Sequence, residues 1–190
     1  MPQFSSQPPA DPRGQALELK RCPPGSVLAG IITCTDVVGC PTHFWGGRTV
    51  PCEEENCEAC QAGIGWRWHG YISAFHTIAK EHFLFEMTAR CVEPLTEYRL
   101  ANPTLRGCSF LAQRPSGKVN GRVFLKTKTV DLESVTLPPS PDLTNVLAMI
   151  WNLPTSSITD AGRIKGHPAV KVNTAGNGQQ WHPETVSHAS

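Results

Sequence analysis

Residues 40–60 hold four cysteines and one histidine, the densest group of potential metal ligands in the chain: Cys40, His43, Cys52, Cys57 and Cys60. They form a Cys-x2-His pair, a single cysteine and a Cys-x2-Cys pair, and two-residue spacing lets both side chains of a pair reach one ion. The segment is poor in apolar residues and cannot build its own core, so a bound metal would supply folding free energy. The pattern predicts a zinc site with four thiolate or imidazole ligands.

A disulfide-linked loop is the competing interpretation, because eight cysteines would suit an extracellular protein. The first residues lack the basic start and the apolar run of a secretory signal peptide, and no stretch reaches the length of a membrane helix. We therefore expect an intracellular protein, cytoplasmic or in the nucleoid, with no membrane partner. Thiols stay reduced in such compartments, where clustered cysteines favour metal over disulfides.

Five candidate ligands compete for four positions. In one arrangement the pairs Cys40/His43 and Cys57/Cys60 face each other, and in the other His43 and Cys52 join Cys57 and Cys60. Four protein ligands favour a closed structural site. The nearby glutamates leave a catalytic zinc as an alternative. The other four cysteines are scattered and are expected to be small buried side chains: Cys22, Cys34, Cys91 and Cys108.

Composition divides the chain into one domain and two tails. Residues 1–16 are rich in Pro, Gln, Ser and Gly, and residues 154–190 are polar with no clear apolar period. Both predict flexible or extended arms. The ordered domain is expected over residues 17–153, with the zinc module at 40–60 inside it.

Apolar and β-branched runs predict five strands, at residues 27–33, 66–76, 81–88, 105–113 and 122–130. Pro94 fits the first turn of a helix that continues to Ala101 and ends before Asn102-Pro103. A C-terminal helix is predicted over 143–151, because Asp142 can cap it and apolar residues recur on one face.

The order of three strands, a helix and two strands resembles the OB-fold, a small five-stranded barrel with a helix between its third and fourth strands. The resemblance covers about residues 26–130 and depends on element order. It implies a mostly β protein in which the cysteine cluster is a zinc-ribbon or knuckle insertion between the first two strands. It also implies that this insertion and the last hairpin flank a face that binds oligonucleotides or oligosaccharides.

The charge pattern points to a polyanion. Residues 105–128 carry six cations and no acid: Arg106, Arg114, Lys118, Arg122, Lys126 and Lys128. Strand alternation places Phe110 among the first of these cations and Phe124 among the last. Cations for phosphates and flat rings for unstacked bases suit single-stranded DNA or RNA. The alternative is that both rings point inward while the basic stems reach around the rim.

Three more residues are candidates for the same interface. Trp45 and Arg48, beside Gly46 and Gly47 in the metal loop, would form a projecting contact, and Tyr71 could stack a base. No phosphate-binding glycine loop, G-x-S-x-G or H-E-x-x-H motif is present, so we expect a non-enzymatic protein. The alternatives are an accessory subunit of a larger nucleoprotein complex and a zinc-dependent nuclease or hydrolase.

Overall fold

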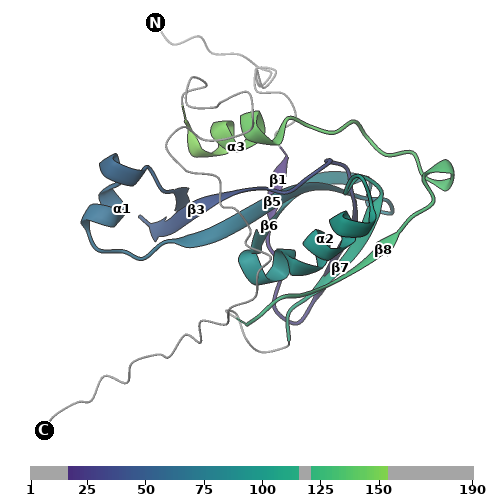
Figure 1. The fold of residues 1–190 in the computed structure, drawn as a ribbon, viewed down its shortest axis with the longest axis horizontal. Coiled ribbons are helices and arrows are strands. Elements are labelled where there is room, and N and C mark those ends of the chain that lie inside the picture. The colour runs from purple at the N-terminus through teal and green to yellow at the C-terminus, as the bar shows by residue number, and fades with distance from the viewer. Residues whose placement is uncertain (1–16, 116–120, 154–190) are drawn as a thin grey trace, which may run out of the picture.

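The computed structural model describes residues 17–115 and 121–153. Within them the chain forms a mixed eight-stranded sheet with few helices, so the protein is mostly β, as the sequence predicts (Figure 1). The strands are β1 (Glu18–Lys20), β2 (Val27–Ile32), β3 (Val38–Trp45), β4 (Arg48–Pro51), β5 (Arg67–His76), β6 (Glu81–Thr88), β7 (Cys108–Gln113) and β8 (Phe124–Thr129). The helices are η1 (Glu54–Asn56), α1 (Glu58–Gln61), α2 (Ala89–Ala101), η2 (Leu132–Ser134) and α3 (Leu143–Trp151). None of these helices is long and apolar enough to cross a membrane.

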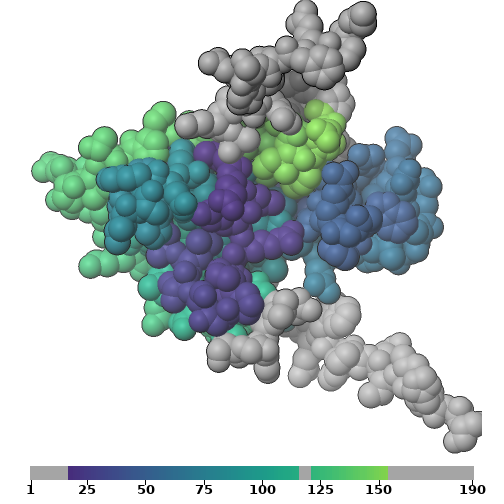
Figure 2. Space-filling model, turned by 180° about the vertical axis from the view of Figure 1, so that it is seen from behind, coloured from purple at the N-terminus to yellow at the C-terminus, as the bar shows by residue number. Residues whose placement is uncertain are grey.

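Strand β5 organises the sheet because three strands share its two edges. Along one edge, β6 pairs with the residues from His69 to His76. The other edge is divided, since β3 pairs with residues 67–71 and β2 pairs with Ala74 and Phe75. From β2 the sheet continues through β7 to β8, while the β3–β4 hairpin leaves it as a branch. Figure 2 shows this branch and the residues after it as a lobe that projects from the rest of the molecule.

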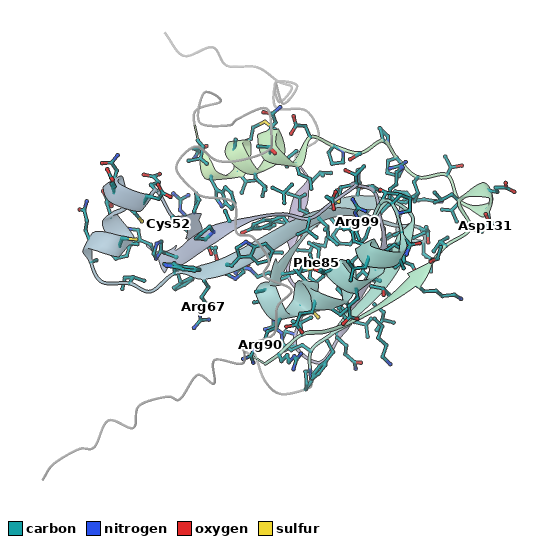
Figure 3. All side chains as sticks on the ribbon, in the orientation of Figure 1. Cys52, Arg67, Phe85, Arg90, Arg99 and Asp131 are labelled. Carbon is teal, nitrogen blue, oxygen red and sulfur yellow. The ribbon has the colours of Figure 1, made fainter. Side chains whose placement is uncertain are left out.

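The two central strands are covered on both faces. Residues 70–74 of β5 and residues 83–87 of β6 are all buried. Because side chains of a strand alternate between faces, consecutive burial requires cover on both sides. Phe85, at the centre of Figure 3, stacks on Phe110 of β7 with ring centroids 5.2 Å apart. Trp151 of α3 meets the ring of Tyr71 edge-on at 5.4 Å, so α3 docks directly on β5.

Most elements predicted from the sequence are confirmed within a few residues. The five expected strands correspond to β2, β5, β6, β7 and β8, and the C-terminal helix is α3. The Asp142 side chain caps α3 by accepting hydrogen bonds from the backbone N–H groups of the second and third residues of the helix. Helix α2 begins at Ala89, five residues before the expected start, and Pro94 lies inside it. Its end at Ala101 agrees with the prediction.

The described strands do not close into a barrel, and the small five-stranded OB barrel is not confirmed. Strand β1 pairs in parallel with β6, placing Glu18 opposite Phe83 and Lys20 opposite Phe85, and so occupies the edge of β6 that a closing strand would need. The sheet path therefore runs from β1 to β8 with both ends open.

Candidate metal centre and nucleic-acid interface

Four potential ligands converge where the β3–β4 hairpin meets η1 and α1. The ligand atoms of His43, Cys52, Cys57 and Cys60 all lie within 4.8 Å of one another. The sulfur of Cys60 lies 3.3 Å from His43 Nε2 and 3.5 Å from the sulfur of Cys52. Three of the four residues are buried, and Cys60 is exposed. This compact group could hold a metal ion.

Local hydrogen bonding explains why these residues meet. The backbone N–H of Cys52 donates to the carbonyl of Pro41 at 2.9 Å, which brings Cys52 next to the β3 face that carries His43. Cys57 immediately precedes α1, and its carbonyl accepts a hydrogen bond from the N–H of Gln61. In this helical turn Cys57 and Cys60 are three positions apart and project on one side. The hairpin supplies one pair of ligands and the helical turn supplies the other.

Cys40 does not belong to this group, so the arrangement that pairs Cys40 with His43 is wrong. The two residues lie three positions apart on a regular strand, and alternation directs their side chains to opposite faces of the sheet. Cys40 lies opposite His69 of β5. Burial, with smaller contributions from Cys52 and Glu86, raises the pKa of the Cys40 thiol to about 12. A thiol in such surroundings stays protonated and inert at neutral pH.

The thiols of the cluster affect one another's ionisation. At Cys57 burial opposes ionisation, but hydrogen bonds from the backbone at Glu53 and Cys60 lower the pKa overall. At Cys60 the hydrogen bond with Cys52 raises the pKa to about 12. Neighbouring thiols cannot all lose their protons while no cation balances the charge. A divalent ion among them would reverse this preference.

The outer face of β8 carries its basic residues in the expected alternation. Phe124, Lys126 and Lys128 are exposed on β8, and 53% of Phe124 is accessible to solvent. Just before the strand, the guanidinium of Arg122 lies over the Phe124 ring, 5.3 Å from its centroid. Arg122 also forms a loose ion pair with Glu93 at 3.7 Å. A flat ring and three cations therefore share one accessible surface.

Two of the other predicted cations have less access to a ligand. Arg106 donates to the backbone carbonyls of Thr33 at 2.7 Å and Pro138 at 2.9 Å, so it ties the segment before α3 to the sheet. Arg114 is half-buried, and its Nε has no hydrogen-bond partner among the described residues. Lys118 lies outside the described residues.

Two predicted stacking residues are core residues instead. Tyr71 is fully buried under Trp151, and only 3% of Phe110, which stacks on Phe85, is exposed. The expectation that these rings contact bases is therefore corrected. Alternation separates the residues of β7 into two sets, but the set that includes Phe110 faces the core.

Trp45 and Arg48 lie opposite each other at the tip of the β3–β4 hairpin and are exposed. Figure 1 places this hairpin, with α1, at one end of the long axis of the molecule and β8 at the other. The hairpin therefore lies away from β8 in this view. Two further exposed rings on the same lobe, Phe44 and Trp66, were not among the predicted site residues. Their sequence positions resemble those of core aromatics, and only the structure shows them exposed.

Comparisons of the chain with protein-family models, with curated proteins and with solved structures found no match.

Proposed function

We propose that the His43, Cys52, Cys57 and Cys60 group binds one structural zinc ion. Zinc–sulfur bonds of ~2.3 Å in a tetrahedron separate the sulfur atoms by about 3.8 Å. The sulfur atoms of Cys52 and Cys60, 3.5 Å apart, already approach this spacing. Three thiols and an imidazole are the donor set that zinc favours. Since four protein ligands complete the coordination, the metal would fix the fold of the lobe and leave no position open for catalysis.

We propose that the protein binds single-stranded nucleic acid on the outer face of β8, and that it is not an enzyme. The exposed ring of Phe124 among Arg122, Lys126 and Lys128 is the observation that carries this proposal. An exposed ring can stack on an unpaired base, whereas bases in a duplex are already stacked on each other. The cations would contact phosphates on either side, largely without base specificity.

The element order supports a relation to the OB-fold as part of the same proposal. Helix α2 lies between the third and fourth of the five strands that the sequence predicts, β2, β5, β6, β7 and β8, as in that fold. The sheet would then be an opened form of the barrel, with β1 occupying the free edge of β6.

A fluorescence titration with a labelled single-stranded oligonucleotide tests the binding face. Lys126→Glu together with Lys128→Glu should weaken binding by more than about tenfold, because each contact releases counterions from the strand. Phe124→Ala should cost about 1–3 kcal/mol if the ring stacks a base, and should leave the salt dependence nearly unchanged. Arg67→Glu, a charge reversal at the exposed start of β5 beside the lobe, is the matched control. Equal affinity of the β8 double variant and the parent would refute the proposal.

A further inference from the structure

A small cavity lies where the tip of the β3–β4 hairpin, the end of β1 and the last turn of α3 meet. Its volume is about 250 Å³, which is room for roughly eight water molecules at ~30 Å³ each. Figure 2 shows α3 between the purple start of the described chain and the blue lobe. The side chains that line the cavity come from all three places: Leu19, Arg21, Arg48, Thr49, Ile150 and Trp151.

The polar side chains of this cavity offer hydrogen-bond donors. Arg21 occupies both oxygens of the Glu86 carboxylate, with Nε 2.7 Å from Oε1 and Nη2 3.2 Å from Oε2. The same Nη2 donates to the hydroxyl oxygen of Thr49 at 2.7 Å. Because this oxygen accepts a hydrogen bond, the proton of the hydroxyl is left to donate to another group. Arg21 Nη1 makes no hydrogen bond within residues 17–115 and 121–153, so its protons are also available.

Arg48 adds a second guanidinium beside these donors. It is exposed, and it forms no ion pair with any residue that the structure describes. The charge of Arg21 is balanced by Glu86, since only 6% of the Glu86 side chain is exposed. None of the described residues that line the cavity is acidic. A ligand that meets donors and a net positive charge here needs acceptor oxygens and negative charge.

The rest of the lining is apolar. Leu19 of β1 and the neighbouring Ile150 and Trp151 of α3 are half-buried. Trp151 is held in place because its ring packs edge-on against the buried ring of Tyr71. An apolar wall with a few convergent polar groups is the usual form of a ligand site. The volume lies below the ~300 Å³ at which sites for drug-sized molecules begin, so the cavity suits a small molecule.

We propose that this cavity binds a small organic anion. The phosphate or carboxylate group of the ligand accepts hydrogen bonds from Arg21 Nη1, the Arg48 guanidinium and the Thr49 hydroxyl, because guanidinium groups match the geometry of these oxyanions. The apolar part of the ligand lies against Leu19 and the end of α3. This site goes beyond the proposed function, because it needs neither the outer face of β8 nor an open position on the metal.

Isothermal titration calorimetry of the zinc-loaded full chain tests this site, with phenyl phosphate and phenylacetate as probes. At least one of the two should bind. Benzylamine and benzyl alcohol carry the same ring without a negative charge and should not bind. The anion without its ring, inorganic phosphate or acetate, should bind at least about fivefold more weakly than the matching probe, because it leaves the apolar wall in contact with water.

Two variants change the cavity and keep the ion pair of Arg21 with Glu86, whose loss would leave a buried charge without a partner. Arg48→Gln removes a charged donor and should weaken binding of the probe at least about fivefold. Thr49→Val removes the hydroxyl and should weaken it about threefold or more. Arg90→Gln is the matched control, because it removes an exposed charge from α2, which does not line the cavity. Thermal unfolding confirms that each variant is folded.

The outcomes separate a specific site from a general effect of charge. The proposal is wrong if neither anion binds, if benzylamine or benzyl alcohol binds as tightly, or if Arg48→Gln and Thr49→Val both bind the probe like the parent. Equal weakening by Arg90→Gln and Arg48→Gln would also refute it, because the probe would then respond only to the net charge of the protein. If the anion without its ring binds as tightly as the probe, the apolar wall is not used and an organic ligand is excluded.

Discussion

The sulfur atoms of Cys52 and Cys60 lie 3.5 Å apart, close enough to share a metal ion and to react with each other when no metal separates them. A disulfide requires the sulfurs to approach to ~2.05 Å. We expect that removal of zinc with a chelator, followed by treatment with hydrogen peroxide, forms a disulfide between Cys52 and Cys60. In this reaction the two thiols are oxidised and the peroxide is reduced to water. Mass spectrometry of unreduced peptides identifies the link. The zinc-loaded protein should be oxidised more slowly, and a predominant link through Cys40 would contradict this geometry.

The purified protein should contain one zinc ion per chain, measured by plasma mass spectrometry. Cys57→Ser should lose the metal, because three remaining ligands bind zinc far more weakly than a complete tetrahedron. Cys40→Ala is the matched control, since that thiol lies on the opposite face of β3 and should not affect the metal content. Full zinc content in Cys57→Ser would refute the ligand set, and loss of zinc in Cys40→Ala would return Cys40 to it.

Gly70→Ala should destabilise the protein by about 1–3 kcal/mol through overpacking. A Cβ atom at Gly70 would lie 2.5 Å from the indole of Trp68 and 2.9 Å from a methyl group of Val37. Gly65→Ala is the control, because a Cβ there meets no atom within 4 Å. Urea denaturation of the zinc-loaded proteins measures both changes. If Gly70→Ala is as stable as Gly65→Ala, the Trp68 side chain moves aside without loss of free energy of unfolding.

The free energy of unfolding should decrease as the pH falls below about 6.5, partly through His82. Burial, followed by the charge of Arg106, lowers the pKa of His82 below its usual value of 6.5. The unfolded chain therefore takes up a proton that the folded protein resists, and stability is lost until the pH lies below the folded-state pKa. Burial likewise lowers the pKa of His69, which adds to the same trend.

Urea denaturation of the zinc-loaded parent and His82→Gln across this pH range measures the contribution of the residue. The variant should show a shallower dependence on pH, because its side chain does not titrate. The comparison between the two proteins cancels the effect of acid on the metal ligands, which both share. Identical pH dependence would contradict the assignment to His82.

Strands β2, β5, β6, β7 and β8 can be predicted because each is a local run of apolar and β-branched residues. Strand β3 cannot, because Gly39 and Pro41 interrupt any such run. Its extended conformation comes from pairing with β5, where Gly39 lies opposite Gly70, and from the β4 hairpin. Strand β1 has only three residues, and its parallel pairing with distant β6 leaves no local pattern to detect.

The candidate site was likewise predictable from the sequence only in part. Ligand types and spacing are local, so the cluster could be found, but the choice between Cys40 and Cys52 depends on the alternation of a strand that was not recognised. Core placement of Tyr71 and Phe110 depends on which face of the sheet the helices cover. Sequence alternation defines two faces of a strand without showing that α3 covers the one with Tyr71.

The divided edge of β5 gives one strand two different neighbours, and its halves should open on different timescales. Residues 67–71 lose their β3 partner whenever the lobe opens, whereas Ala74 and Phe75 are held by β2 within the main sheet. Amide hydrogens of the first half should therefore exchange through local, metal-dependent opening, and those of the second half through global unfolding. A single continuous strand would then report two separate stabilities, one set by metal occupancy and one by the core.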